Sequence, residues 1–122
     1  MIHLNIGSNI KSKFGDRFEN ISTAINLLIN SNVKIIKISN FYETPSYPNK
    51  KLPYFLNVGV SANFQYDETV LLNEISLIEK KIGRTRSKKN DPRVCDIDII
   101  DFNGQIIDKD NLQIPHKKCH LR

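Results

Sequence analysis

The sequence predicts an α+β fold, in which two helices cover one face of an antiparallel β-sheet. Apolar residues alternate with polar ones along several segments, as they do in half-buried strands. Along two other segments they recur with the period of an amphipathic helix. The segments follow one another in the order β-α-β-β-α-β, which is typical of the ferredoxin-like arrangement, with one sheet face covered and the other open.

The first strand is expected at residues 2–6, where isoleucine and leucine alternate with polar residues before Gly7. A helix should begin at Asp16, because Asp16 and Glu19 have the spacing of a capping box. It should end at the polar residues 30–32. The apolar residues on its expected buried face are Phe18, Ile21, Ile25, Leu28 and Ile29.

Two strands should follow this helix. Residues 33–44 are rich in β-branched and aromatic side chains, but their alternation slips at Ile35 and Ile36, which indicates a bulge. After a proline-rich loop, residues 54–64 alternate without a break. One face of this strand carries Leu56, Val58, Val60, Ala62 and Phe64, and the other carries Phe55, Asn57, Gly59, Ser61 and Asn63.

The second helix should begin at Asp67 and end at Gly83, a residue type that commonly terminates helices. Its apolar positions are Leu71, Ile75, Ile78 and Ile82. A fourth strand is expected at residues 94–102. The dipeptide Asn103-Gly104 after it is a strong signal for a tight turn, so we expect an additional β-hairpin there.

Composition limits the class of protein. The 122 residues are enough for one domain with its own core. A net charge of +5 and a pI of about 9.3 favour an anionic partner. Cys95 and Cys119 form no recognisable disulfide framework, which favours a reducing compartment. Because the N-terminus lacks a signal-peptide pattern and no apolar segment is long enough to span a bilayer, we expect a cytoplasmic protein.

Two aspartates in the fourth strand are the first indication of chemistry. Alternation places Cys95, Ile97 and Ile99 on one face of the strand and Asp96 and Asp98 on the other. Two carboxylates this close disfavour each other's ionisation unless a cation lies between them. Mg²⁺ is a suitable cation, because it takes carboxylate oxygens together with waters and substrate phosphates. The alternative is a solvated strand that carries ordinary acidic residues.

A basic loop precedes this strand. Its cations are Arg84, Arg86, Lys88, Lys89 and Arg93. A polyphosphate fits between such a loop and a metallated acidic pair, with guanidinium groups on one side and the metal on the other. The combination predicts phosphoryl transfer, a reaction that depends mainly on positioning and on neutralising charge.

A series of motifs then resembles those of the 6-hydroxymethyl-7,8-dihydropterin pyrophosphokinase family of folate biosynthesis. In chain order they are "IGSN" at 6–9, "SNFYETPSY" at 39–47, "FLNVGV" at 55–60, "IEKKIGRTR" at 78–86, "DPRVCDIDIIDFNG" at 91–104 and "IPH" at 114–116. The similarity covers nearly the whole chain. The resemblance implies that ATP gives its β,γ-diphosphate to the pterin hydroxymethyl group, with release of AMP.

The resemblance also implies roles for individual residues. Asp96 and Asp98 would hold two Mg²⁺ ions, and Arg84 and Arg93 would act with them on the triphosphate. Nucleotide contacts would come from Glu79, Arg84, Arg86, Arg93, His116 and Arg122. Pterin contacts would come from Thr44, Pro45, Phe55 and Asn57, with the ring of Phe55 stacking on the pterin.

Members of the resembled family continue beyond the position of Arg122, so we expect residues 1–122 to form a single domain that is incomplete at its C-terminus. We expect a monomer that binds ATP and the pterin, but neither nucleic acid nor a membrane. A basic ferredoxin-like sheet is also found in RNA-binding modules, although the acidic pair would repel a phosphate backbone unless metallated. Another two-metal nucleotide enzyme is the second alternative, but it would not account for the Thr44-Pro45 loop or for Phe55 and Asn57.

Overall fold

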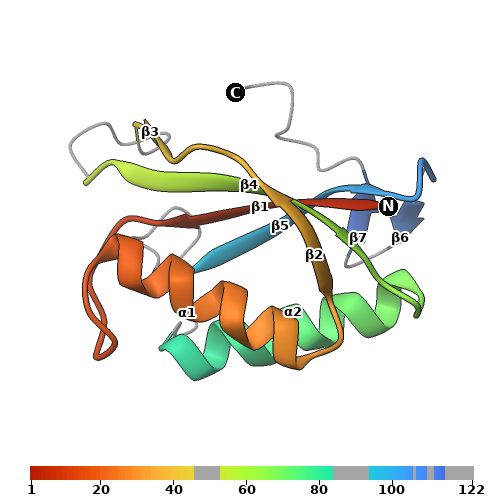
Figure 1. Cartoon of the computed structure of the whole chain (residues 1–122), viewed down its shortest axis with the longest axis horizontal. Helices are drawn as coiled ribbons and strands as arrows, with labels where there is room; N and C mark the ends of the chain where they lie inside the picture. Colours follow the sequence, from red (N-terminus) through yellow and green to blue (C-terminus); the bar gives the residue numbers. More distant parts are fainter. Residues whose placement is uncertain (46–52, 84–93, 106, 110–111, 115–122) are drawn as a thin grey trace.

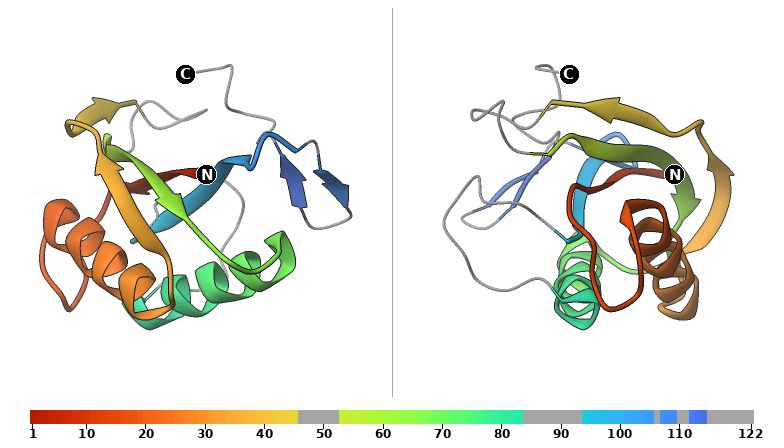
Figure 2. Two further views of the ribbon diagram at one scale, coloured as in Figure 1. Left: turned by 45° about the vertical axis from the view of Figure 1, so that its right-hand side comes forward. Right: turned by 90° about the vertical axis from the view of Figure 1, so that its left-hand side faces the viewer.

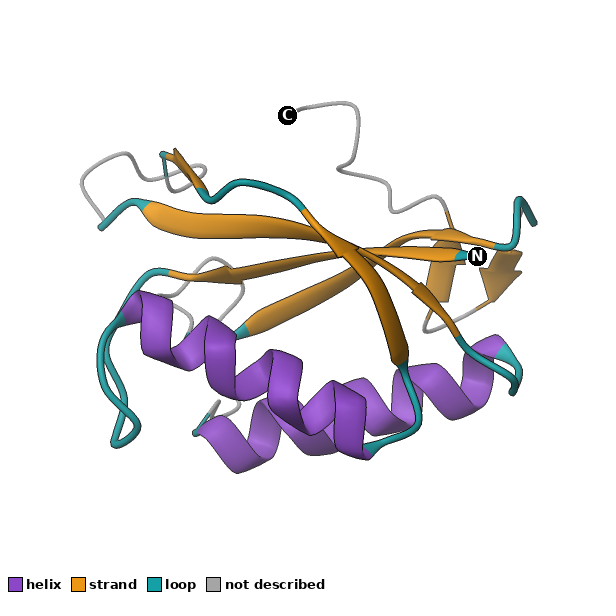
Figure 3. Ribbon diagram, in the orientation of Figure 1, coloured by secondary structure: helices purple, strands orange, loops and turns teal. Residues whose placement is uncertain are grey.

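Two helices lie under one face of an antiparallel sheet (Figure 1, Figure 3). The computed structural model describes residues 1–45, 53–83, 94–105, 107–109 and 112–114, the last two ranges by their backbone alone. The helices are α1 (Arg17–Asn30) and α2 (Glu68–Ile82). The strands are β1 (Ile2–Ser8), β2 (Lys34–Ile38), β3 (Tyr42–Thr44), β4 (Phe55–Asn63), β5 (Asp96–Phe102), β6 (Ile107–Lys109) and β7 (Leu112–Ile114). The predicted α+β class is confirmed.

The main sheet has the strand order β2-β4-β1-β5, with β3 also pairing with β4, and all of these pairs are antiparallel. β1 is therefore central, and its residues have β4 on one side and β5 on the other. The core fills the layer between this sheet and the two helices (Figure 2). Residues of β1, β4 and β5 that point toward the helices are almost completely buried, including Leu4, Val58 and Ile97.

The strand expected at residues 33–44 is divided into β2 and β3. The register of β2 against β4 shifts between Ile35 and Lys37, which confirms the predicted bulge. β3 then pairs with the beginning of β4, where Tyr42 is opposite Asn57 and Thr44 is opposite Phe55. The division matters for the site, because it brings β3 alongside the polar residues at that end of β4.

Helix α1 begins as predicted, with Asp16 and Glu19 forming a capping box. The predicted apolar face is wrong at both ends, since Phe18 is 53% exposed and Ile29 is 50% exposed. The buried positions are instead Asn20, Ile21, Ala24 and Leu28. The reason is a pair of hydrogen bonds, which the side-chain amide of Asn20 donates to Ser8 Oγ and to the Ile10 carbonyl. These bonds hold the Asn20 side of the helix against the sheet.

Helix α2 follows its sequence pattern closely. Asp67 accepts a hydrogen bond from the Val70 amide, and Gly83 ends the helix with a φ of 122°, a value that favours glycine. All of the predicted apolar positions are buried, and they are Leu71, Ile75, Ile78 and Ile82. Glu79 is buried with them. Neither described helix is long and apolar enough to cross a membrane.

Strand β5 contains a bulge that the sequence analysis did not predict. Leu4 of β1 is opposite Ile99, whereas the preceding His3 is opposite Asp101, so Ile100 is the extra residue. The adjacent isoleucines Ile99 and Ile100 were the available signal, as with the isoleucine pair in β2. Phe102 thereby returns to the core face, where it is 3% exposed.

The turn at Asn103-Gly104 is confirmed, since both residues have a positive φ and the Gln105 amide donates to the Phe102 carbonyl. The expected hairpin differs from the structure. Among the described residues, Phe102 and Gln105 form an isolated bridge, and the two-stranded sheet is made by β6 with β7 instead. In Figure 2 these two strands stand beside the end of β5, apart from the main sheet.

Candidate active site

Asp96 and Asp98 lie on the sheet face opposite the helices, as their alternation with buried residues predicted. Both are half-buried, and Ile97 between them is directed into the core. β1 runs alongside, with Gly7 opposite Asp96 and Asn5 opposite Asp98. The two carboxylates therefore border the central strand of the sheet.

Gly7 separates the acidic pair from a set of uncharged polar groups on β4. It is opposite Asp96 on one side and opposite Asn57 on the other. Because neighbouring strands are roughly 5 Å apart, Asp96 and Asn57 are about 10 Å apart across this glycine. A Cβ atom at Gly7 would lie 3.0 Å from Asn57 Oδ1 and 3.3 Å from Phe55 Cδ1. Glycine thus allows both side chains to approach β1.

The side chain of Asn57 is 3% exposed and is held by hydrogen bonds on both sides. Its Nδ2 donates to Thr44 Oγ1 at 2.9 Å and to the Phe55 carbonyl at 3.4 Å. Its Oδ1 accepts from Asn5 Nδ2 at 3.2 Å. Three of the residues predicted to contact a pterin, Thr44, Phe55 and Asn57, are therefore brought together, and exposed Pro45 directly follows Thr44.

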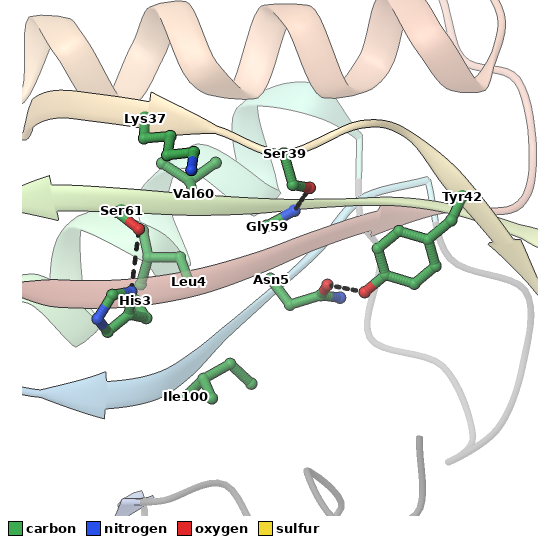
Figure 4. A pocket seen from close by; sticks show the side chains of 10 residues that line it. All are labelled: His3, Leu4, Asn5, Lys37, Ser39, Tyr42, Gly59, Val60, Ser61 and Ile100. Carbon is green, nitrogen blue, oxygen red and sulfur yellow. Dashed lines mark hydrogen bonds between the residues drawn. The ribbon is translucent and has the colours of Figure 1, made fainter.

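Asn5 and Tyr42 extend this network, and sequence reasoning missed both. The Tyr42 hydroxyl donates to Asn5 Oδ1 at 2.8 Å, so hydrogen bonds run from β3 to β1, to β4 and back to β3. Figure 4 shows the Tyr42 hydroxyl pointing at the Asn5 amide from across the sheet. The available signal was the alternation in the first strand, which places Asn5 on the open face together with His3 and Gly7.

A hollow of about 430 Å³ adjoins this network on the open face (Figure 4). Asn5 and Tyr42 form one part of its wall, and His3, Lys37 and Ile100 form another. His3 Nδ1 lies 3.0 Å from Ser61 Oγ within the hollow. Ile100 reaches the hollow because it lies on the same face of β5 as Asp96 and Asp98.

Glu79 lies on the helix side of the sheet. It is 7% exposed, and its Oε2 accepts a hydrogen bond from the backbone amide of Ile97 at 2.9 Å. The carboxylate thus contacts β5 at the residue between Asp96 and Asp98. The role that the family resemblance implies for Glu79, a contact with the nucleotide, remains a prediction.

The remaining predicted site residues lie outside the described residues. They are Arg84, Arg86, Arg93, His116 and Arg122. Within the described part of the chain, no group of three or more histidine, cysteine, aspartate or glutamate side chains is arranged to hold a metal ion. Mg²⁺ in phosphate-transferring sites commonly takes only one or two carboxylates, with waters and substrate phosphates as its other ligands. Asp96 and Asp98 fit that donor set.

The fold and the site define an α+β protein whose exposed sheet face brings paired carboxylates next to buried amides. Over residues 3–122 the chain matches the model of the family described as 7,8-dihydro-6-hydroxymethylpterin-pyrophosphokinase (HPPK). The chain belongs to this family.

Curated relatives agree with the family match. The chain is 33% identical over 121 residues to the 2-amino-4-hydroxy-6-hydroxymethyldihydropteridine pyrophosphokinase of Bacillus subtilis, an alignment that covers 98% of this chain and 70% of that protein. It is 32% identical over 117 residues to the folic acid synthesis protein fol1 of Pneumocystis carinii, covering 96% of this chain and 15% of that protein. It is 35% identical to the bifunctional protein FolKE of Lactococcus lactis, covering 98% of this chain and 34% of that protein. The chain therefore spans less than half of the latter two relatives.

Proposed function

We propose that this chain transfers the β,γ-diphosphate of ATP to the hydroxymethyl group of 6-hydroxymethyl-7,8-dihydropterin and releases AMP. The observation that carries the proposal is the position of Gly7, which has Asp96 on one side and Asn57 on the other. A phosphate-binding metal at the aspartates of β5 and a flat heterocycle at Asn57 of β4 would then lie on the same sheet face, with only β1 between them.

In this reaction the hydroxymethyl oxygen attacks the β-phosphorus of ATP. The bond between that phosphorus and the oxygen that bridges it to the α-phosphate breaks, and AMP leaves with that oxygen. The hydroxymethyl proton is released. Little covalent help is required from the protein, because such transfers depend on in-line positioning and on neutralising charge.

Asp96 and Asp98 are the residues that would hold Mg²⁺, and we propose that they hold two ions. When bound, the metal neutralises triphosphate charge and orients the reacting phosphoryl group. We assign the cationic phosphate contacts to Arg84, Arg86 and Arg93, and further nucleotide contacts to Glu79, His116 and Arg122. The basic loop and the acidic pair would then contact the triphosphate from different sides.

The pterin is proposed to bind at the other side of Gly7. Phe55 is half-buried at the start of β4, and its ring lies beside the position that a Gly7 Cβ would occupy. An aromatic ring at this point offers a face for stacking. Thr44, Pro45 and Asn57 would then surround the edge of the heterocycle that carries its hydrogen-bonding groups.

The strand order β2-β4-β1-β5, with helices after β1 and after β4, supports the finer proposal that the fold is ferredoxin-like. We further propose a cytoplasmic monomer whose partners are ATP and the pterin rather than nucleic acid. Half-buried carboxylates on the exposed sheet face, beside the central strand β1, favour a metal-bound nucleotide over a polynucleotide backbone.

The test is incubation of the chain with ATP, Mg²⁺ and the pterin, followed by separation of the nucleotide products. AMP should form in a one-to-one ratio with pterin diphosphate. ADP as the sole nucleotide product would show transfer of a single phosphoryl group and would refute the proposal. Omission of the pterin is the control, since a contaminating ATPase would hydrolyse ATP without it.

A further inference from the structure

We propose that Asn5 and Tyr42 are positioning residues that determine which hydrogen-bonding groups Asn57 and Thr44 present to the ligand. This inference rests on the proposed function, because it concerns the edge of the pterin that Asn57 would contact. The residues form one chain of hydrogen bonds, from the Tyr42 hydroxyl through the amides of Asn5 and Asn57 to the Thr44 hydroxyl. We call this chain the amide relay.

The direction of the relay is determined by its fixed end. The Phe55 carbonyl can only accept a hydrogen bond, so the Asn57 atom that faces it must be Nδ2. Asn57 Oδ1 then faces Asn5, which must present its own Nδ2 in return. Asn5 Oδ1 is left to face Tyr42, and the phenolic hydroxyl must therefore be the donor.

This direction limits what the site can offer. Both Nδ2 hydrogens of Asn57 are directed to protein acceptors, Thr44 Oγ1 and the Phe55 carbonyl. Asn57 Oδ1 uses one lone pair for Asn5 and keeps a second one. The Thr44 hydroxyl accepts from Asn57 and keeps its own proton. The pair therefore presents an acceptor at Asn57 and a donor at Thr44.

An acceptor next to a donor matches a ligand edge on which an N–H group adjoins a carbonyl oxygen. In a 4-oxo pterin, N3 carries a hydrogen and C4 carries the carbonyl. In the 4-amino analogue the pattern is inverted, because N3 accepts and the amino group donates. The relay should therefore favour binding of the 4-oxo form. When the 4-amino form binds, acceptor would face acceptor and donor would face donor, and these unpaired groups reduce affinity more than a missing contact does.

Burial explains why the direction should persist in the absence of ligand. Asn5 is 7% exposed and Asn57 is 3% exposed, so water cannot readily replace their mutual hydrogen bond. Tyr42 is 43% exposed and supplies the outer end of the relay through its hydroxyl. Removing that hydroxyl frees Asn5 to turn its amide, and Asn57 then loses the donor that holds its oxygen in place.

The experiment measures the binding of two fluorescent probes, 6-hydroxymethylpterin and its 4-amino analogue, with Mg²⁺ and a non-hydrolysable ATP analogue present. The wild-type chain should prefer the 4-oxo probe. Tyr42→Phe and Asn5→Leu should each reduce the ratio of the two dissociation constants by about three- to tenfold. The double variant should show little further reduction, since both changes interrupt one relay.

Ser61→Ala is the matched control. It also removes one hydroxyl from a side-chain hydrogen bond on the same sheet face, with His3, and it lies outside the relay. Its ratio should equal that of the wild type. If Tyr42→Phe folds and binds the pterin normally but leaves the ratio of the two dissociation constants unchanged, the relay is refuted and the proposed function still stands. Failure of the wild-type chain to bind either probe would overturn the proposed function and this inference with it.

Discussion

Glu79 of α2 accepts a hydrogen bond from the backbone amide of Ile97, at 2.9 Å, on the strand that carries the two candidate metal ligands. The contact joins the helix layer to β5 at the residue between Asp96 and Asp98. Because Glu79 is 7% exposed, water is largely excluded from this contact. The carboxylate thereby satisfies a backbone group that would otherwise be buried without its partner.

The first prediction follows from this contact. Glu79→Leu should reduce the free energy of unfolding by about 1–3 kcal/mol, since it leaves the Ile97 amide without this acceptor. Glu79→Gln retains an oxygen that can accept the hydrogen bond from the Ile97 amide, so it should reduce the free energy of unfolding by less. Urea unfolding of both variants measures the difference. Equal stability of Glu79→Leu and the wild type would contradict this prediction, whatever the effect of the substitution on ATP binding.

The second prediction concerns the acidic pair. Asp98→Asn should lower turnover on the order of a hundredfold or more, because a neutral amide is a poor ligand for Mg²⁺ and leaves phosphate charge uncompensated. The free energy of unfolding of Asp98→Asn should stay close to that of the wild type. Asp101→Asn is the matched control, because Asp101 lies on the same strand beyond the bulge and opposite His3. Comparable losses in both variants would show that general charge, rather than a metal site, is responsible.

The third prediction uses Gly7. Gly7→Ala places a Cβ atom 3.0 Å from Asn57 Oδ1 and 3.3 Å from Phe55 Cδ1, so both side chains must move. We expect a loss of stability of about 1–3 kcal/mol and pterin binding weakened by roughly tenfold or more. Gly59→Ala is the control on the same face, since its Cβ would meet Ser39 at 3.4 Å, an ordinary contact. Equal effects of the two substitutions would argue against a packed site around Gly7.

The fourth prediction tests the start of α1. Asp16→Ala removes the side chain that accepts a hydrogen bond from the Glu19 amide, and the return hydrogen bond, which the backbone amide of residue 16 donates to Glu19 Oε1, loses its fixed geometry. The free energy of unfolding should fall by about 1 kcal/mol. Asp16→Asn should retain most of the stability, because its side-chain oxygen can still accept. Thermal unfolding of the two variants checks this. If Asp16→Asn lost as much stability as Asp16→Ala, the capping hydrogen bond would be excluded as the cause.

Local sequence patterns determined most of the fold. Asp16 with Glu19 predicted the start of α1, and the isoleucine pair at 35–36 predicted the bulge in β2, because caps and alternation depend on nearby residues alone. Alternation likewise placed Asp96 and Asp98 away from the helices. The helical period failed at Phe18 and Ile29, because the inward face of α1 depends on the hydrogen bond from Asn20 to the segment after β1.

The tertiary structure decided how the site residues meet. Asn5, Tyr42 and Asn57 lie on three different strands, and only strand order and register bring them within hydrogen-bonding distance. Gly7 could be recognised as part of a motif, but its position between Asp96 and Asn57 follows from pairing across the whole sheet. Sequence patterns report the period of a single element, whereas contacts between strands depend on how distant segments pack, and no local pattern specifies that packing.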